Sequence, residues 1–426
     1  MSGGRSDAGE GARTTRVYLY FAPLMLLVYL GLPKGPLVNI SVSFMLKNRL
    51  HASPSEVALF VFLTALPTYL SFPFGLARDR WNLFGLRDRG LLLLFAPLTA
   101  LVFVCLGFSR LSLAGLFAGM LTAEITYQFV FAAYSGLTAL VAQEQLMSGR
   151  LASLLGIVVL LPSIAGALAS GWFVEHVSPG HTFFVVAALV LGIALVGMWK
   201  PRAVFEHLYD QPAAQGASLR EDIRRLLGHR AVYPAVAINL LAQFNPGFGA
   251  AMQYYVTDRL HASDAVYGYY IAIFAASFIP VYFLYGQLCK RIKLRTLLWW
   301  GTVILIPQTV PLALIHTGTQ ALFLAMPLGL LGGIAGAAYS DLAMRTCPPG
   351  LQGTFMMLVV GVTAFANNAS AILGAEIYSA SPTRGFLYDA ILTVAVTAAI
   401  LPVLKLIPEK LIVTSDGEHN PAVEAG

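Results

Sequence analysis

Two ionisable side chains lie inside apolar stretches of the sequence, where a charge is expensive. The first is Lys34, which falls about 17 residues into an apolar run. At about 1.5 Å of rise per residue, a helix would place it near the middle of a membrane. A charge at that depth costs at least about 2.5–3.5 kcal/mol unless it is paired or hydrated. It is flanked by two glycines and two prolines, Gly31, Pro33, Gly35 and Pro36. Because prolines remove backbone donors and glycines loosen a helix, we expect a broken first helix that lines a cavity.

The second ionisable side chain is Glu124, about twelve residues into the fourth apolar stretch. Tyr127 and Gln128 follow at i+3 and i+4, so the three share one helix face. A carboxyl group in a low dielectric favours its neutral form unless a cation is near, which is the behaviour of a proton-coupling site. We therefore expect Glu124 to bind a coupling proton and Lys34, Tyr127 and Gln128 to contact an anionic substrate.

A purely structural role for the two charges is the alternative. Lys34 and Glu124 could form a static ion pair between the first and fourth helices, since buried pairs also serve conformational specificity. That alternative predicts that each single replacement harms folding, and that apolar replacement of both residues restores it.

Neutral polar and aromatic residues of the second half are further candidates for substrate contact. They are Asn239, Gln243, Phe244, Asn245, Tyr254 and Asn367. Phe244 corresponds to Lys34 under an offset of 210 residues, so the second half offers an aromatic group where the first has a charge. Tyr254 or its neighbour Tyr255 could stack on a flat ring. Asn367 is the weaker candidate, because amides inside a helix bundle often link helices.

The composition around these residues is that of a membrane protein. Of the 426 residues, 57% are hydrophobic and only 11% are charged. The charges separate apolar stretches of roughly 20 or more residues, the length of helix that crosses a membrane. We count twelve spans, at about 17–45, 55–76, 89–108, 112–142, 150–175, 181–199, 231–257, 265–287, 296–316, 319–344, 352–379 and 385–406.

Lys and Arg are distributed unevenly between the loops on the two sides. With both termini in the cytoplasm, the inner loops and tails hold 21 of the 27 basic residues. The outer loops hold Lys47, Arg49, Arg110, Arg259 and Arg384. This asymmetry follows the positive-inside bias, so the chain is expected to be integral to the cytoplasmic (inner) membrane with both termini cytoplasmic. The net charge of +6 reports this topology, and we expect no nucleic-acid partner.

Charged and glycine residues at the cytoplasmic helix ends could form a gate that closes the inner mouth in one state and opens in the other. They are Gly75, Asp79, Arg80, Glu144, Arg150, Gly286, Lys290, Arg291, Asp341 and Arg345. Asp341 and Arg345 are spaced i, i+4, which favours an ion pair. The alternative is that these charges are solvated anchors that fix the topology.

An internal repeat indicates duplication. The pentapeptide at 49–53, Arg-Leu-His-Ala-Ser, recurs at 259–263. Gly75-x-x-x-Asp79-Arg80 is matched by Gly286-x-x-x-Lys290-Arg291. Two features held in register suggest two similar halves.

The repeat and the spans define five regions. These are a tail (1–16), a six-helix bundle (17–199), a central loop with an amphipathic helix that begins at Ser218 (200–230), a second six-helix bundle (231–406) and a second tail (407–426). This plan resembles the major facilitator superfamily, whose halves are parallel repeats. Gly75-x-x-x-Asp79-Arg80 resembles the start of the superfamily's signature, although residues 81–84 intervene before the next glycine. The resemblance implies an all-α membrane protein of twelve transmembrane helices in two pseudo-symmetric bundles.

A narrower resemblance is to the folate–biopterin transporter family. It rests on Asn245-Pro246-Gly247, Tyr254-Tyr255-x-x-Asp258-Arg259-Leu260, Lys290-Arg291-x-Lys293-Leu294-Arg295 and Cys347-Pro348-Pro349-Gly350, although that family commonly has an acid where Gln352 stands. Gly31-Leu-Pro33 is also similar to muropeptide permeases. The resemblance implies pterin or folate substrates.

The sequence therefore favours a secondary active transporter that moves a small polar or anionic organic solute, with protons as the coupling ion, by alternating access. A muropeptide-like or drug permease is one alternative, and a non-transporting assembly or pigment-handling factor of the same fold is another. No nucleophile elbow, phosphate-binding loop or metal-ligand spacing is present, so we expect no enzyme, metal or cofactor. The expected partners are the solute, the coupling proton and the lipid bilayer, with the chain acting as a monomer.

Overall fold

The computed structural model is helical throughout the part of the chain it describes, residues 3–108, 112–176, 179–206, 208, 218–248, 250–381 and 384–418. No strand occurs in these residues. The first helices are α1 (Gly3–Leu30), α2 (Pro36–Phe44), α3 (Pro54–Tyr69), α4 (Phe72–Arg80), α5 (Asp88–Phe108), α6 (Leu113–Glu144), α7 (Ser148–His176), α8 (Pro179–Met198), α9 (Arg202–Phe205) and α10 (Leu219–Gly228). The others are α11 (Val232–Gln243), α12 (Ala250–Tyr254), α13 (Asp264–Leu288), α14 (Leu294–Leu305), α15 (Gly318–Thr346), α16 (Gln352–Ala380), α17 (Gly385–Ala398), α18 (Ile400–Leu404) and α19 (Glu409–Ile412). Two π-helices, η1 (Met45–Arg49) and η3 (Tyr255–Arg259), and two 3₁₀ helices, η2 (Leu83–Gly85) and η4 (Ile306–Leu314), complete the set.

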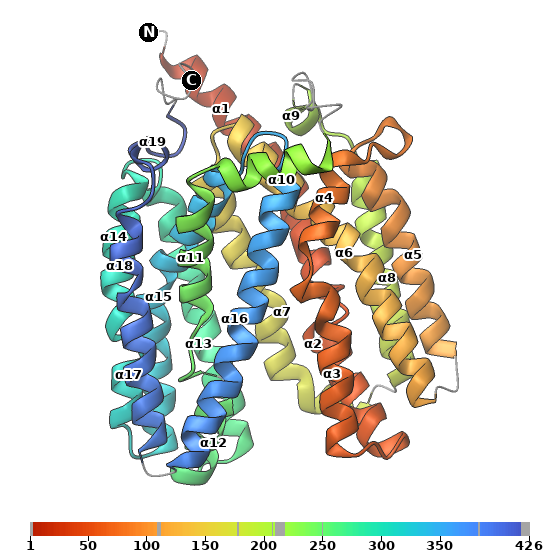
Figure 1. Ribbon diagram of the computed structural model, residues 1–426, viewed down its shortest axis with the longest axis vertical. Helices are drawn as coiled ribbons and strands as arrows, with labels where there is room; N and C mark the ends of the chain where they lie inside the picture. Colours follow the sequence, from red (N-terminus) through yellow and green to blue (C-terminus); the bar gives the residue numbers. More distant parts are fainter. Residues whose placement is uncertain are drawn as a thin grey trace. The chain divides into compact units, whose positions relative to one another are not determined.

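These helices form two compact units. The first unit comprises Met1–Glu144, Ala169–Asp222 and Pro349–Met357, and the second comprises Gln145–Leu168, Ile223–Pro348 and Leu358–Gly426. In the second unit α14 packs against α15, α17 and α18 (Figure 1). The domain limits expected from the sequence, 17–199 and 231–406, remain a prediction.

The first and seventh predicted spans are broken helices. The first span divides into α1, the turn Gly31–Gly35, α2 and the π-helix η1, so the break expected around Lys34 is confirmed. The seventh divides into α11, the turn that contains Asn245, α12 and the π-helix η3.

The repeated pentapeptide has the same backbone in both copies. The π-helices η1 and η3 lie 210 residues apart, as the pentapeptides do. Ala52 N–H donates to Leu46 O at 2.9 Å, and Ala262 N–H donates to Val256 O at 3.1 Å. His51 and His261 both take a left-handed conformation, with φ of 47° and 51°. An unusual turn repeated at this offset supports duplication of the chain.

Nine of the described helical segments are long and apolar enough to cross a membrane. Two of them contain a short interruption, between α3 and α4 and between α17 and α18. The sequence predicted twelve spans, and the other three are divided into shorter pieces: the first, the seventh, and the ninth, in which α14 passes into the 3₁₀ helix η4. Pro307 and Pro311 lie in η4, where a missing N–H prevents a regular α-helix.

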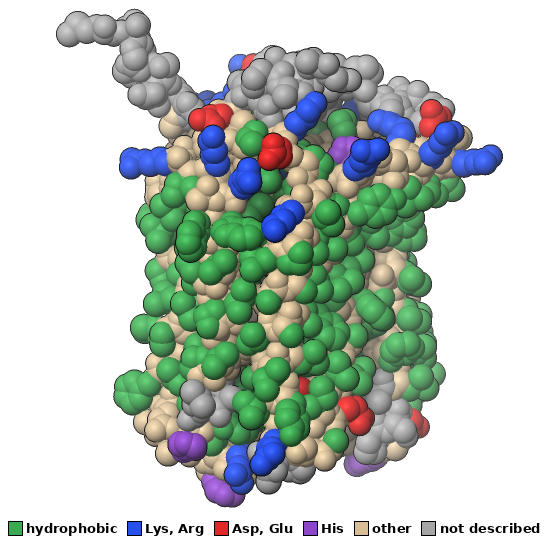
Figure 2. All heavy atoms as spheres, turned by 60° about the vertical axis from the view of Figure 1, so that its left-hand side comes forward, with side chains coloured by type: hydrophobic (Ala, Val, Ile, Leu, Met, Phe, Trp, Pro, Cys, Tyr) green, Lys and Arg blue, Asp and Glu red, His purple; other side chains and the backbone are tan. Residues whose placement is uncertain are grey.

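Hydrophobic side chains cover a broad belt of the face drawn in Figure 2, and the Lys and Arg side chains on that face gather toward its two ends. Large exposed apolar residues include Leu195, Trp300, Phe323, Ile372 and Ile391. An apolar surface of this extent is unusual for a protein in water and is typical of contact with lipid.

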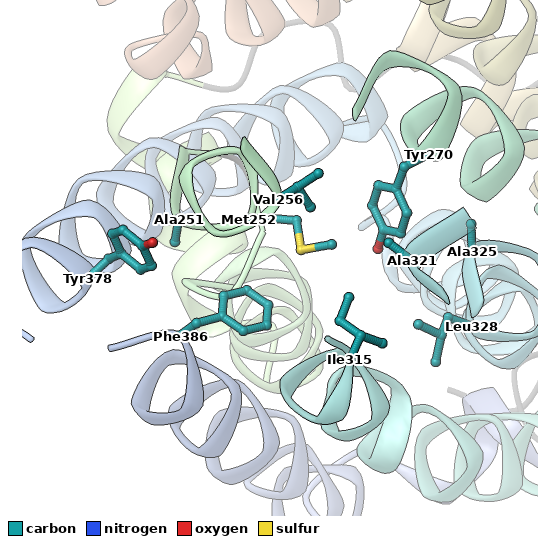
Figure 3. Close-up of a cluster of buried hydrophobic side chains, with 10 residues drawn as sticks. All are labelled: Ala251, Met252, Val256, Tyr270, Ile315, Ala321, Ala325, Leu328, Tyr378 and Phe386. Atoms are coloured by element: carbon teal, nitrogen blue, oxygen red, sulfur yellow. The ribbon is translucent and has the colours of Figure 1, made fainter. Parts of the chain in front are cut away.

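A cluster of buried side chains surrounds α12 and η3 in the second unit (Figure 3). Met252 and Val256 are fully buried there, and Phe386 of α17 stacks on Tyr255 with ring centroids 4.2 Å apart. The Tyr255 hydroxyl donates to Ile315 O at 2.9 Å. This packing fixes the broken seventh span against α15 and α17, so Tyr255 has a structural role in this conformation.

Glycines let α13 and α15 pack closely in the second unit. A Cβ atom at Gly329 of α15 would lie 1.8 Å from the Ser277 hydroxyl oxygen and 2.5 Å from the Phe274 carbonyl oxygen. One at Gly333 would lie 2.6 Å from Val281. Gly329 and Gly333 of the tenth predicted span therefore permit close contact between α13 and α15.

Gly329→Ala should destabilise the protein, because the methyl group has no room between α13 and α15. We expect a loss of about 1–3 kcal/mol in the free energy of unfolding, measured as a lower thermal midpoint of the purified protein. Gly268→Ala on α13 is the matched control, since no atom lies within 4 Å of its Cβ position. Equal midpoints for the two variants would contradict this packing.

Candidate substrate and gating sites

A buried hydrogen-bonded triad surrounds Glu124 in the first unit. Its Oε1 accepts from the Thr68 hydroxyl of α3 and from Gln128 Nε2 at 2.9 Å. Gln128 Nε2 also contacts Thr68 Oγ1 at 3.1 Å. Glu124 is 4% exposed, and its second oxygen, Oε2, has no hydrogen-bond partner in the described residues. The spacing of Glu124 and Gln128 correctly predicted a shared face, and the structure adds Thr68.

Lys34 lies in the break between α1 and α2, in the same unit. Its side chain is exposed, and Nζ donates to Val61 O at 3.2 Å. No direct Lys34–Glu124 ion pair occurs in the described chain. The static pair is therefore not formed in this conformation, and Lys34 is accessible.

Tyr127 holds the end of α1. The last carbonyls of an interrupted helix lack intrahelical donors, and the Tyr127 hydroxyl donates to one of them, Val28 O. Its ring is 1% exposed, so it positions the break and is not accessible to a solute in this conformation.

The candidates of the second unit occupy different environments. Asn239 Nδ2 donates to Ala235 O at 2.9 Å within its own helix, and Gln243 is exposed. Phe244 and Asn245 lie in the break between α11 and α12, and Asn245 Oδ1 accepts from the Thr393 hydroxyl at 3.0 Å. Tyr254 and Asn367 are exposed. Tyr254 stacks on Tyr378, with centroids 6.3 Å apart.

Asp79 caps the N-terminus of α16 within the first unit. Its carboxylate accepts from the backbone N–H groups of Gly353 at 3.0 Å and Thr354 at 2.6 Å, and from the Thr354 hydroxyl at 2.6 Å. Negative charge is favourable at this end of the helix dipole. A Cβ atom at Gly75 would lie 2.3 Å from Gly353 O, so the motif glycine permits the close approach.

Arg78 completes this cluster, although the sequence did not single it out. Its guanidinium pairs with Asp79 at 2.7 Å and makes a two-point contact with Asp88 of α5. The next motif residue, Arg80, pairs instead with Asp222 of α10 at 3.0 Å. The helix expected to begin at Ser218 is present, and the Ser218 hydroxyl accepts from Glu221 N–H at 3.2 Å.

Arg345 and Asp341 form the predicted i, i+4 ion pair at the end of α15 in the second unit, at 2.8 Å. Tyr285 donates to Asp341 Oδ2 at 2.9 Å, and Arg345 Nε also contacts the Ser148 hydroxyl at 3.0 Å. Glu144, another gate candidate, ends α6 in the first unit.

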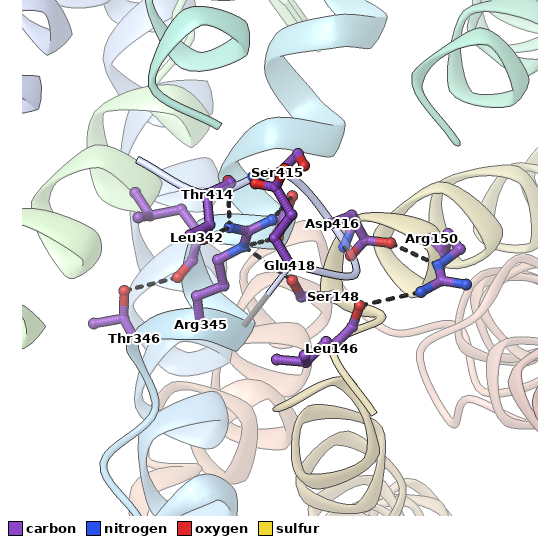
Figure 4. Close-up of polar contacts among 12 residues, drawn as sticks. Leu146, Ser148, Arg150, Leu342, Arg345, Thr346, Thr414, Ser415, Asp416 and Glu418 are labelled. Atoms are coloured by element: carbon purple, nitrogen blue, oxygen red, sulfur yellow. Dashed lines mark hydrogen bonds and ion pairs between the residues drawn. The ribbon is translucent and has the colours of Figure 1, made fainter. Parts of the chain in front are cut away.

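The C-terminal tail enters this cluster of the second unit, as Figure 4 shows. Asp416 is fully buried at its side chain and pairs with Arg150 at 2.6 Å. Its other oxygen accepts from Gly149 N–H at 2.9 Å, close to the N-terminus of α7. Asp416 N–H donates to Cys289 O at 2.8 Å, and Arg345 Nη1 donates to Thr414 O at 3.0 Å.

The carboxylate of Asp416 supplies the acidic group that the second glycine–charge motif, Gly286-x-x-x-Lys290-Arg291, lacks. Lys290 stands where the first motif has Asp79, and both Lys290 and Arg291 are exposed. Gly286 keeps its packing role, because a Cβ atom there would lie 2.7 Å from Ser153 Oγ on α7. The carboxylate at the start of α7 comes from Asp416, about 126 residues further along the chain than Lys290.

A cleft of about 460 Å³ in the second unit lies away from these candidates. It is lined by residues of α14, α18 and α19, among them Arg295, Trp299, Trp300, Lys405 and Glu409. Tryptophan beside basic residues is typical of a membrane–water interface. None of the expected substrate residues lines this cleft.

Sequence reasoning missed Thr68, Asp88, Asp416 and Asp389. The last is the only charged residue between Gly385 and Leu404, and it is fully buried without a hydrogen-bond partner in the described chain. A search for isolated charges in apolar runs, the criterion that found Lys34, could have found it.

Comparison with known proteins identifies the family of this chain. The model of the Major Facilitator Superfamily matches residues 21–375. The chain belongs to this superfamily of membrane transporters. Its membership agrees with the expectation that the protein is not an enzyme.

Two curated relatives are folate carriers by name. The chain is 26% identical over 355 residues to the folate-biopterin transporter of Synechocystis sp., covering 79% of this chain and 70% of the relative. It is 22% identical over 371 residues to folate transporter 1 of Plasmodium falciparum, covering 79% of this chain and 68% of the relative.

Solved structures share the fold. The human organic anion transporter MFSD10 matches with a TM-score of 0.60 at 15% identity, over 92% of this chain and 99% of that one. An outward-facing bacterial homologue of the iron transporter ferroportin matches with a TM-score of 0.65 at 16% identity, over 91% and 98%. These likenesses confirm the all-α superfamily fold.

Release of the tail should expose Cys289. Burial raises the pKa of this thiol, so it reacts slowly while the tail is docked. Hydrogen bonds to a charged group contribute about 1.5–3 kcal/mol, so Asp416→Ala should speed Cys289 modification by a maleimide about 10- to 100-fold. The rate is measured in a variant that lacks Cys105 and Cys347.

Glu409→Gln is the matched control, because its partner Arg295 is exposed and the pair lies outside the cluster. It should leave the Cys289 rate unchanged. A rate in Asp416→Ala equal to that of the parent would mean that Asp416 does not hold the tail in place.

Proposed function

We propose that this transporter moves a small anionic organic solute of the pterin or folate class together with protons, by alternating access. The observation that carries the proposal is the buried Glu124 carboxyl group, which has one oxygen without a partner among the described residues and lies in the same unit as the accessible Lys34. The names of the two curated relatives support the solute class.

Glu124 is the proposed proton site. Both of its donors, Thr68 and Gln128, are neutral and reach the same oxygen, Oε1. A proton on Oε2 would remove a charge that is costly in a buried site. Gln128 Oε1 also has no partner in the described residues, so this residue pair offers an acceptor for a protonated carboxyl group.

Lys34 is the proposed anion site. Within the described residues its ammonium group has one hydrogen bond, to Val61 O, and it can offer further donors to a carboxylate. The helix break puts it on irregular backbone, which at membrane depth is tolerated only inside protein or beside water. Phe244 and Tyr254 are the proposed aromatic contacts, with Asn239, Gln243, Asn245 and Asn367 as polar ones.

The proposed location is the cytoplasmic (inner) membrane, with both termini and the central loop 200–230 in the cytoplasm. The basic residues of the loops support this orientation. The proposed gate comprises the two clusters around Asp79 and Arg345, each described within its own unit.

Glu124→Gln should abolish uphill, proton-driven uptake and keep solute exchange, because the amide mimics the protonated acid.

Lys34→Ala should weaken solute binding about 10- to 100-fold, the effect of losing a charged hydrogen bond. Binding, exchange and proton-driven uptake are measured in liposomes with folate and a pterin.

Lys47→Ala is the control for Lys34, since Lys47 is an exposed lysine of the same unit. Wild-type uphill uptake in Glu124→Gln would refute proton coupling at this residue. A structural ion pair would give a different pattern, in which both single variants express poorly and an apolar double variant recovers. A scaffold without transport activity would show no uptake of any solute.

The topology is tested with single cysteines in a variant without native cysteines. Ser218→Cys should react with an impermeant maleimide only from the cytoplasmic side, and Ser263→Cys only from the outer side. Labelling of intact cells and of inside-out vesicles provides the measurement. Reaction of Ser218→Cys in intact cells would reverse the orientation.

A further inference from the structure

A second buried carboxyl group lies in the second unit, on α17. Asp389 is the only charged residue in the apolar segment Gly385–Leu404, and its exposed fraction is zero. Neither Oδ1 nor Oδ2 has a hydrogen-bond partner in the described residues. A leucine or threonine would suit this helix better, so packing alone does not explain an acid here.

No charged group of the described residues pairs with Asp389. The elements packed against α17 are α11, α12, α14, α18, η3, η4 and the end of α16. Their charged residues are Asp258, Arg259, Arg295 and Glu376, all of them exposed. Their titratable tyrosines are Tyr233, Tyr254, Tyr255 and Tyr378, and none of these bonds to Asp389.

The face of α17 that carries Asp389 packs on the break between α11 and α12. Thr393, one turn after Asp389, donates to Asn245 Oδ1 at 3.0 Å and accepts from Gly247 N–H at 3.3 Å. The Cβ position of Gly247 lies 3.7 Å from the backbone carbonyl of Asp389. Any movement of the break therefore changes the surroundings of this turn of α17.

A second unsatisfied polar group belongs to the same neighbourhood. Thr309 of η4 is 2% exposed, and its hydroxyl has no partner in the described residues. The 3₁₀ helix η4 packs directly on α17. Polar groups left unsatisfied inside a membrane are expensive and usually functional.

An ionised carboxylate without a partner is far more costly in a buried site than the neutral acid is. We propose that Asp389 is a proton-binding site, protonated while α17 packs on the Asn245–Gly247 break and deprotonated when the break moves and water reaches the carboxyl group. In this step the O–H bond of the acid breaks, the proton passes to the water that reaches the carboxyl group, and the carboxylate remains.

This site would add a second proton to the one assigned to Glu124. The role of Asp389 in coupling rests on the proposed function, whereas its protonation state does not depend on that function. The chain would then carry one proton site in each unit, at Glu124 in the first and at Asp389 in the second.

Infrared spectroscopy of the protein in lipid nanodiscs tests the protonation state directly. At neutral pH the wild-type protein should show a protonated-carboxyl band that Asp389→Asn lacks and that Asp258→Asn, the exposed control, retains. Protein labelled with ¹³C at the aspartate carboxyl carbon should show the isotope shift of that band without any substitution. Absence of a shifted band, or a band unchanged in Asp389→Asn, would overturn the proposal.

The number of protons moved per solute, measured from the reversal of transport in liposomes, tests the coupling. Asp389→Asn should lower this number by one. An unchanged number would overturn a coupling role for Asp389. Wild-type uptake in Glu124→Gln would instead refute only the first proton site, because the infrared band of Asp389 does not depend on Glu124.

Discussion

A charge in the low-dielectric interior of a membrane must find a partner or give up its charge, and this constraint decides where the polar residues of the chain lie. At helix ends the partners are complete: Arg78 contacts two carboxylates, and Asp79 accepts from backbone N–H groups at the start of α16. Carboxylates deeper in the spans lack a complete set of partners in the described chain. Glu124 has only neutral donors and Asp389 has none in the described chain. The groups at helix ends are thus suited to hold helices together, and the deeper ones to change their charge.

Helix breaks are the second consequence of the same constraint. Lys34 and Asn245 both lie where a span is interrupted, and the two interruptions precede π-helices that are 210 residues apart. A broken helix exposes carbonyl and N–H groups that polar side chains must satisfy, as Tyr127 does for Val28 and Thr393 does for Gly247. Each unit therefore contains one broken span at the same offset, with a cation in the first and neutral groups in the second.

Periodicity and composition were sufficient to predict those features that depend only on neighbouring residues in the sequence. The helix break at Lys34, the shared face of Glu124 and Gln128, the Asp341–Arg345 pair and the cap at Ser218 are all local, and each is present. Partners distant in sequence could not be found in this way. Thr68 reaches Glu124 from another helix, and Asp416 belongs to a tail, 407–426, whose polar composition gave no reason to expect burial. The breaks in the seventh and ninth spans were missed because apolar length conceals a change of helix type.

The two copies of the glycine–charge motif reach the same contact by different routes, and the difference has a mechanical consequence. In the first copy the capping carboxylate, Asp79, is part of α4, so its contact with α16 can open only if a membrane helix moves. In the second copy the position holds Lys290, and the carboxylate at α7 is Asp416 of the tail. That contact can open when residues 414–416 leave, with every membrane helix in place. The docking of these residues therefore adds to the free energy that the Arg345–Ser148 contact between α15 and α7 contributes to the second cluster, and this added part can be changed without altering the transmembrane spans.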